Sequence, residues 1–295
     1  MVVAEKGWNA IFLSLPPDAA AADGARLAVF RGGEFLSQIP EDAEALIVSA
    51  PAALEQTLRA VAERDTLVRF DFSSAGDSLI IHARGLAAHS SKPWDGRNAI
   101  THLATLLDVI DWPPTQAARM VRLVNDLVGT GDYAELFGDL AYAHDFMGPL
   151  TLSLTTLGRQ DDALVAGINF RSPVGRTVEE IERAIREAVA GWKDATGVDV
   201  DLNTIIIAPY YPEDAPHIPV LLDVFRFYTG AQEAQPISIG GGTHARLVPN
   251  GVNFGPAMPG EPYTGHSEHE FMTRKQFVKN LEMYTAMLVE LAGRH

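Results

Sequence analysis

The sequence predicts an α+β fold in which an antiparallel sheet is flanked by helices. Two pairs of β-rich segments, within residues 67–85 and 150–171, are each joined by a short turn, which is typical of β-hairpins. Up to about residue 207 the elements run in the order strands, helix, hairpin, helices, hairpin, helix, strand. This order favours antiparallel pairing over the regular strand–helix alternation of a parallel sheet.

The segments up to the first hairpin predict short strands and one helix. The expected strands are residues 8–15, 26–31, 45–49, 67–72 and 78–85. The helix begins at Pro51, because apolar residues recur at helical spacing after it. A second helix is expected at about residues 98–109, beyond a turn rich in small residues.

The second hairpin lies between two further helical segments. Residues 115–140 carry a mostly helical pattern that is interrupted by glycine. The hairpin joins residues 150–158 to residues 162–171. Thr177 opens the next helix, whose acidic residues gather near its start as the helix dipole favours. A strand at residues 198–207 completes this part.

Three prolines within residues 209–216 mark a change along the chain. We therefore expect two domains, residues 1–207 and residues 208–295. The expected elements of the second are residues 220–228, a short strand ending in ISIGGG, residues 251–255 and residues 274–291. This part is too poor in strands to form a sound sheet alone, so we expect it to belong to a larger α/β domain.

Composition excludes several classes of partner. The 295 residues include 38 acidic and 23 basic ones, which gives a formal charge of −15 without any concentrated basic run. Nucleic acid and anionic membrane surfaces both need such a run, so neither is an expected partner. No apolar run is long enough to span a membrane and the N-terminus does not read as a signal peptide, so we expect a cytoplasmic protein. Because cysteine is absent, a zinc site would have to use His, Asp and Glu.

Two stretches of the second domain carry candidate ligand-binding residues. His266 lies in YTGHSEHEFMT, where its imidazole suits zinc, although polar residues that cap the last helix would give the same pattern. The sequence GGGTHAR contains Gly241, Gly242 and Thr243. Backbone N–H groups of such a loop can approach an anion closely, and a plain flexible turn is the alternative.

Two residues of the first domain are also candidates. His89 lies in GLAAHSSKPWDGRNA, between a strand and a helix, where a histidine is either catalytic or structural. Arg171 lies in INFRSP at the end of a strand. There its guanidinium would bind a carboxylate or form a surface ion pair.

In their order along the chain, these motifs resemble one family. GLAAHSSKPWDGRNAI resembles the G-x-x-A-H-x-S-x-P-x-x-G-x-N-A segment in the lid domain of the di-zinc metallopeptidases that include aminoacylase, succinyl-diaminopimelate desuccinylase and glutamate carboxypeptidase. INFRSP is similar to that family's N-x-R-x-P strand. IGGGTHAR and PAMPGEPYTGHSEHEF are similar to its glycine-rich loop and its late H-x-x-N/D-E motif. GGEFLSQIPEDAEALI resembles the lid segment of the peptidase-V-like dipeptidases within the family.

The resemblance implies catalytic and metal-binding roles for three residues. His266 would be a zinc ligand. His89 would polarise the scissile carbonyl and stabilise the oxyanion. Ser37 stands where the dipeptidases carry Asn, and its hydroxyl would supply at most one further oxyanion contact. In the late motif His269 replaces the usual Asn or Asp and precedes Glu270, so the resemblance assigns neither a role.

The resemblance also implies a substrate site. Arg171 and the amides around Gly241, Gly242 and Thr243 would hold the terminal carboxylate of a short peptide. The family's other zinc ligands and its catalytic base belong to an H-x-D pair, a bridging Asp, a Glu-Glu pair and a further Asp or His, and no H-x-D triplet or Glu-Glu metal site precedes residue 37. We therefore expect a lid followed by the C-terminal segment of an α/β zinc-peptidase domain, without the N-terminal metal-binding half.

These features predict a zinc-dependent dipeptidase that acts on peptides with a free C-terminal carboxylate and has two zinc ions in its complete form. This chain alone is expected to be inactive. An N-acyl amino acid deacylase or desuccinylase of the same family, or a non-catalytic binding module derived from it, is the alternative. Apolar residues facing the missing half would promote self-association. They are Ile237, Ile239, Val252, Phe254 and Met258.

Overall fold

A computed structural model describes the chain except for residues 19–23, 256–259, 261–263, 265–268 and 294–295. The chain forms two compact units. The larger unit is Gly7–Ala208, and the smaller one combines Met1–Lys6 with Pro209–His295. Residues 1–6 were expected in the larger unit, whereas their strand pairs with a strand of the smaller one.

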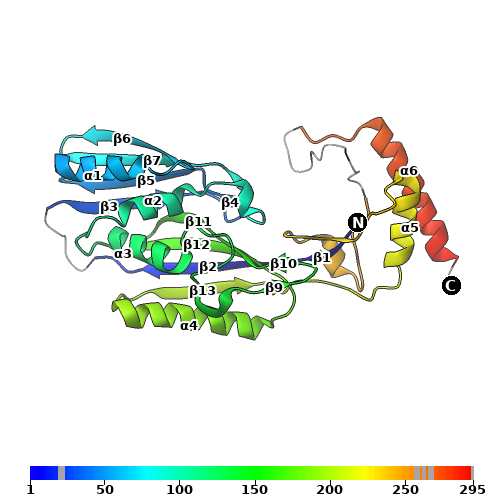
Figure 1. Cartoon of the computed structure of the whole chain (residues 1–295). Coiled ribbons are helices and arrows are strands. Elements are labelled where there is room, and N and C mark those ends of the chain that lie inside the picture. The colour runs from blue at the N-terminus through cyan, green and yellow to red at the C-terminus, as the bar shows by residue number, and fades with distance from the viewer. Residues whose placement is uncertain (19–23, 256–259, 261–263, 265–268, 294–295) are drawn as a thin grey trace. The chain divides into compact units, whose positions relative to one another are not determined.

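The larger unit is built on an eight-stranded sheet whose neighbouring strands pair antiparallel (Figure 1). In sheet order the strands are β13 (Asp201–Ile206), β2 (Gly7–Leu15), β12 (Ala163–Ser172), β11 (Thr151–Gln160), β3 (Arg26–Gly32), β5 (Asp42–Val48), β7 (Ser78–Arg84) and β6 (Arg69–Ala75). Both expected hairpins, β6–β7 and β11–β12, are present. The predicted α+β class is confirmed.

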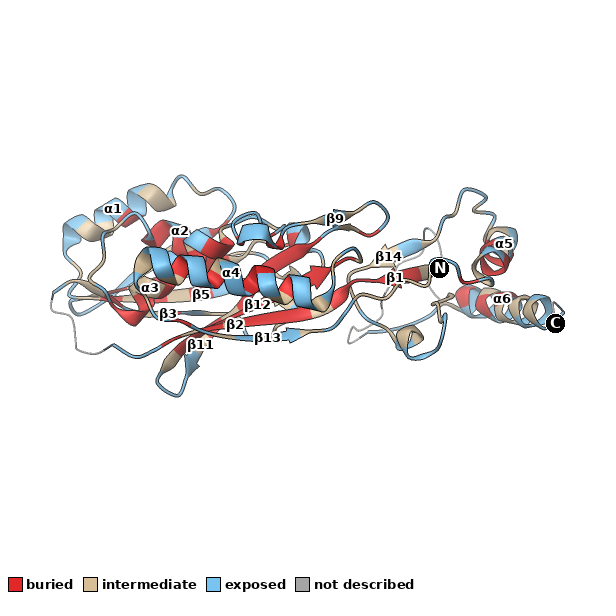
Figure 2. Cartoon of the chain, turned by 90° about the horizontal axis from the view of Figure 1, so that it is seen from below, coloured by how far each residue is buried: buried red, intermediate tan, exposed pale blue. Residues whose placement is uncertain are grey.

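Four helices lie on one side of this sheet (Figure 2). They are α1 (Ala52–Ala62), α2 (Ala99–Leu107), α3 (Gln116–Leu123) and α4 (Val178–Thr196). Each turns its apolar residues toward the sheet, as Ile181, Ile185 and Val189 do along α4. Buried side chains from the sheet and these helices form one continuous core.

Short elements complete the larger unit. They are β4 (Gln38–Ile39) with β8 (Ala88–His89), β9 (Ala143–His144) with β10 (Gly148–Pro149), and 3₁₀ turns at Pro93–Asp95 and Gly138–Leu140. The prediction that residues 115–140 are mostly helical is wrong for their second half. Helix α3 continues as a π-helical turn, Val124–Val128, and then stops at Gly129. Gly129 has a φ of 64° and a ψ of −161°, a backbone conformation outside the helical region that residues with a side chain rarely adopt, so the helix ends there.

Capping residues fix the ends of the longer helices. Thr177 Oγ1 accepts the N–H of Glu180, whose side chain accepts the N–H of Thr177 in return, so α4 begins with a capping box. Asn98 caps α2 and also donates from Nδ2 to the carbonyl of Leu154 over 2.7 Å. The start of α2 is therefore tied directly to strand β11.

The smaller unit contains little sheet. Its elements are β1 (Val2–Glu5), α5 (Ile218–Thr229), β14 (Ile237–Ile239), a 3₁₀ turn at His244–Leu247 and α6 (Arg274–Ala292). Strands β1 and β14 pair in parallel. The strand expected at residues 251–255 is reduced to a single bridge between Asn253 and Val2.

Apolar side chains are only partly covered in the smaller unit. Ile237 is 50% exposed, whereas Ile239, Val252 and Phe254 are half-buried. Met258 lies outside the described residues. Among the helices that the structure describes, none combines the length and the apolar character needed to cross a membrane.

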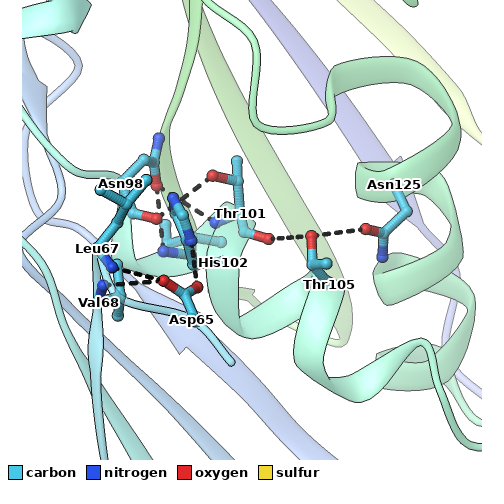
Figure 3. Close-up of polar contacts among 9 residues, drawn as sticks. Asp65, Leu67, Val68, Asn98, Thr101, His102, Thr105 and Asn125 are labelled. Atoms are coloured by element: carbon cyan, nitrogen blue, oxygen red, sulfur yellow. Dashed lines mark hydrogen bonds and ion pairs between the residues drawn. The ribbon is translucent and has the colours of Figure 1, made fainter. Parts of the chain in front are cut away.

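One half-buried polar pair joins the α1–β6 connection to helix α2 (Figure 3). Asp65 Oδ2 lies 2.5 Å from His102 Nδ1, and Asp65 Oδ1 accepts the backbone N–H groups of Leu67 and Val68. Partial burial alone would raise the pKa of Asp65. The hydrogen bonds from His102 and Leu67 outweigh burial, so that this pKa lies below its usual value.

Asp65→Asn should lower the free energy of unfolding by about 1–3 kcal/mol at pH 7, because a charged acceptor of three donors is lost. A depressed folded-state pKa stabilises the protein above the unfolded-state pKa of about 3.9, and this contribution disappears as the pH falls through the folded-state value. Urea denaturation at pH 7 and pH 3 should therefore show a difference between variant and wild type that shrinks at pH 3.

The exposed Asp145 offers a matched control. Asp145→Asn should change the free energy of unfolding little at either pH. A difference between Asp65→Asn and wild type that stays equal at the two pH values would contradict the assigned pKa direction.

Candidate functional site

A short ladder brings two candidate residues of the larger unit to one turn. Strands β4 and β8 pair antiparallel with Gln38 opposite His89. Next to this pair, the N–H of Ser90 donates to the carbonyl of Ser37 over 2.9 Å. Ser37 and His89, which lie far apart in the sequence, are therefore neighbours.

Two glycines allow this turn to pack tightly. A Cβ atom on Gly85 would lie 1.9 Å from the carbonyl oxygen of Arg97, and one on Gly96 would lie 2.9 Å from the carbonyl oxygen of Leu86. Leu86 and Arg97 form an antiparallel bridge between these glycines. Any side chain at position 85 would push the two backbone segments apart.

The imidazole of His89 is oriented by Ser91. The N–H of Ser91 donates to His89 Nδ1 over 3.1 Å, and Ser91 Oγ lies 2.8 Å from the same nitrogen. Because Nδ1 accepts this backbone donor, the proton of the neutral ring belongs on Nε2. His89 is exposed, so it presents a ring whose Nε2–H can donate.

Arg171 is buried beside this turn, on strand β12. Its side chain donates from Nη2 to Ser90 Oγ over 3.1 Å and from Nε to Asn169 Oδ1 over 2.9 Å. Arg171 is only 2% exposed, and its burial lowers the pKa of the guanidinium to about 10. The side chain therefore keeps its positive charge at neutral pH.

Ser90 and Asn169 are hydrogen-bond partners of Arg171 that the motifs did not indicate. Ser90 Oγ donates to Asn169 Oδ1 over 2.9 Å, and Asn169 Nδ2 donates to the carbonyl of Asn9 over 2.9 Å. Asn169 and Arg171 are two residues apart on a strand, so they point to the same face. The two-residue spacing of N-x-R in the sequence could have indicated Asn169 as a neighbour of Arg171. Ser90 could have been noticed because it directly follows His89.

The glycine-rich loop belongs to the smaller unit and is held by Glu5. The N–H of Thr243 donates to Glu5 Oε2 over 2.9 Å, and Thr243 Oγ1 donates to Glu5 Oε1. Asn253 Nδ2 donates to Thr243 Oγ1 over 2.7 Å and to Glu5 Oε1 over 3.3 Å. Glu5 is 1% exposed. The Thr243 amide, which we expected to bind a substrate carboxylate, thus binds a carboxylate of the chain itself.

Gly241 and Gly242 lie in a more open part of this loop. A Cβ atom on Gly241 would meet no other atom within 4 Å, and one on Gly242 would come no closer than 3.4 Å to Arg246 Nη1. Neither glycine has the positive φ that would require one. Neither a lack of space for a side chain nor a positive φ therefore requires glycine at these two positions.

His266 lies outside the described residues, whereas His269 and Glu270 are described and exposed. Within the described part of the chain, no group of three or more His, Asp or Glu side chains is arranged to hold a metal ion. The described residues therefore do not provide a zinc site.

Comparison with known proteins identifies relatives of this chain. No protein-family model matches it. Putative dipeptidase YtjP of Bacillus subtilis is 29% identical over 296 aligned residues, which cover 99% of this chain. A putative dipeptidase of Staphylococcus saprophyticus is 26% identical over 89% of this chain. The chain is thus similar to both proteins over most of its own length. It spans 61% and 55%, respectively, of their lengths.

Solved structures show a weaker likeness. Aminoacylhistidine dipeptidase from Vibrio alginolyticus matches 98% of this chain, and 62% of its own chain is covered, at 15% identity and a TM-score of 0.44. Human carnosine dipeptidase 1 matches 99% of this chain at 10% identity and a TM-score of 0.43, with 56% of its own chain covered. Similarity at this level does not bear on what the chain does.

Glu5→Ala should destabilise the smaller unit by about 1–3 kcal/mol, because the donors of Thr243 and Asn253 would lose a buried acceptor. Amide hydrogen exchange of the Thr243 N–H should accelerate correspondingly. Glu290→Ala, at an exposed position of α6, is the matched control and should leave that exchange rate unchanged. Unaltered protection of the Thr243 amide in Glu5→Ala would show that Glu5 does not hold the loop.

Proposed function

We propose that this chain binds short peptides through their free C-terminal carboxylate, as part of a zinc-dependent dipeptidase that hydrolyses them. The observation that carries the proposal is that a buried cation, Arg171, donates to Ser90, the residue that follows the exposed His89. Sequence similarity to proteins named dipeptidases supports the same reaction. Because the chain spans less than two thirds of the length of those relatives, we propose the reaction for the whole protein rather than for this chain alone.

In this proposal Arg171 binds the carboxylate of the substrate. Two of its partners, Ser90 Oγ and Asn169 Oδ1, are neutral acceptors. A carboxylate that replaced one of them would form a charge-assisted hydrogen bond, which is shorter and stronger than a neutral one. Partial exclusion of water strengthens the attraction further. The preference for a free carboxylate over an amide follows from this charge.

His89 would act on the carbonyl of the scissile amide. Its Nε2–H can donate to the carbonyl oxygen, whose negative charge grows as the tetrahedral intermediate forms. A donor that is fixed before the reaction stabilises this charge without having to reorganise. The bonds between Ser91 and Nδ1 supply the required orientation and tautomer.

Zinc and the glycine-rich loop complete the proposal. Zinc would activate water for attack on the amide, with His266 as the ligand that the sequence resemblance assigns. Since the described residues do not form a set of metal ligands, only binding and polarisation are assigned to them. For the amides of Gly241 and Gly242, contact with the substrate carboxylate remains part of the proposal. Thr243 would contribute only if its bonds to Glu5 opened.

Calorimetric titration with alanyl-leucine and alanyl-leucinamide tests the proposal directly. The wild-type chain should bind the free acid more tightly than the amide. Arg171→Gln should weaken binding of the acid by about 10- to 100-fold, the effect of losing one charged hydrogen bond. It should affect the amide little, so the two ligands should then bind about equally.

Arg159→Gln is the matched control, because Arg159 is an exposed arginine on the neighbouring strand. Circular dichroism would establish that both variants are folded. Equal affinity of wild type for acid and amide, or an undiminished preference for the acid in Arg171→Gln, would overturn the proposed role of Arg171.

His89→Ala should weaken binding of a phosphinate dipeptide analogue, whose tetrahedral centre carries a charged oxygen, by tenfold or more. It should leave the affinity for the parent dipeptide nearly unchanged, because an oxyanion contact is stronger in the transition state than in the ground state. His82→Ala, on the exposed side of β7, is the control. Equal losses for the two ligands in His89→Ala would indicate a general binding role instead.

A further inference from the structure

A cavity of the larger unit borders the His89 turn, with which it shares Gly96 and Arg97, and it has polar groups of both signs in its wall. Its volume is about 240 Å³, which is small compared with the pockets of roughly 300–1,000 Å³ that hold drug-sized molecules. The groups that bear on its chemistry are Leu67, Trp94, Arg97, His102, Asp132 and Ser153. They come from connections between elements and from α2 and β11.

Arg97 contributes a guanidinium that is fixed in place. Its Nη1 donates to the carbonyl oxygens of Trp94 and Gly96, and its backbone bridges to Leu86. In the described part of the chain, Nη1 is the only atom of this side chain that forms a hydrogen bond. Arg97 is half-buried, so its remaining N–H groups are donors that a ligand in the cavity can use.

Asp132 contributes a carboxylate to the same cavity. Its backbone carbonyl accepts the N–H of Leu152 over 2.8 Å, which fixes the position of the residue. Partial burial and the nearby Glu135 raise the pKa of Asp132, while Arg97 acts in the opposite direction. The structure describes both Arg97 and Asp132, and no guanidinium nitrogen of Arg97 lies within 4.0 Å of a carboxylate oxygen of Asp132. The two charges therefore face the cavity without forming an ion pair.

His102 adds a second acceptor. Its Nδ1 is engaged by Asp65, as Figure 3 shows, so Nε2 is the ring nitrogen that remains. When Nδ1–H donates to the carboxylate of Asp65, Nε2 of the neutral ring is an acceptor. The cavity thus offers one cationic set of donors and two acceptors, Asp132 and His102, beside apolar groups at Leu67 and Trp94.

We propose that this cavity binds a free α-amino acid with an apolar side chain. The α-carboxylate would accept from Arg97, and the α-ammonium, with its three donors, would be bound by Asp132 and His102. The zwitterion would neutralise both unpaired charges at once, while its side chain covers Trp94 and Leu67, which are 46% and 55% exposed. The inference does not depend on peptide hydrolysis.

Titration of the whole chain with L-leucine, L-leucinamide and N-acetyl-L-leucine tests the proposal on unmodified protein. L-Leucine should bind, and each derivative should bind at least tenfold more weakly, because one lacks the carboxylate and the other the ammonium. The ¹H–¹⁵N NMR resonances of Asp132 and of the Trp94 indole should shift with L-leucine. Absence of binding at 10 mM, or equal affinities for the three compounds, would overturn the proposal.

Asp132→Asn provides a second, independent arm. It should weaken L-leucine binding by about tenfold or more and should affect L-leucinamide as well, since both carry the ammonium. Asp145→Asn, at an exposed position, is the control. Unchanged L-leucine affinity in Asp132→Asn would refute the assignment. The preference of the same variant for alanyl-leucine over its amide reports separately on the proposed function, so the two ideas can fail independently.

Discussion

Arg171 imposes the strictest condition on the larger unit, because a guanidinium can be buried only where polar groups are arranged to receive it. Asn169 meets part of this condition by accepting from both Arg171 and Ser90, while its own amide is tied to the carbonyl of Asn9. The Asn9 side chain in turn accepts the N–H of Ile207 over 2.9 Å. The register of three neighbouring strands, β12, β2 and β13, is thus linked to the burial of one charge.

Arg171 in the larger unit and Glu5 in the smaller one are charged side chains of opposite sign, and each is buried within a polar network. In the smaller unit the charge is the carboxylate of Glu5, which is satisfied by Thr243 and Asn253. Such networks are rigid when every donor has an acceptor, and they destabilise the fold when the loss of one partner leaves a buried polar group unpaired. Arg171 and Glu5 therefore constrain the shape of their surroundings more than neighbouring apolar residues do, because apolar packing tolerates small shifts.

Periodicity and turn signals were sufficient to predict the antiparallel hairpins and the long helices. These signals did not predict where the helix ends at Gly129, which depends on the backbone conformation of one residue. They also did not predict that β1 pairs with β14, a strand far along the chain. Motif resemblance located His89 and Arg171 but could not reveal that Arg171 donates to Ser90, the residue after His89, since this hydrogen bond depends on the register of separate strands. Glu5 escaped notice for the same reason, because its partners lie more than two hundred residues away.

The pairing of β1 with β14 also constrains how the smaller unit can fold. Its first strand is separated from the rest of that unit by the whole of Gly7–Ala208. During synthesis, β1 leaves the ribosome long before β14, so Glu5 has no partner on Thr243 until most of the chain has emerged. The larger unit, whose contacts are complete by residue 208, can fold meanwhile and bring the ends of its insertion together. Assembly of the smaller unit is thus a late event with high contact order, and mutations that slow folding of the larger unit would prolong exposure of an unpaired strand.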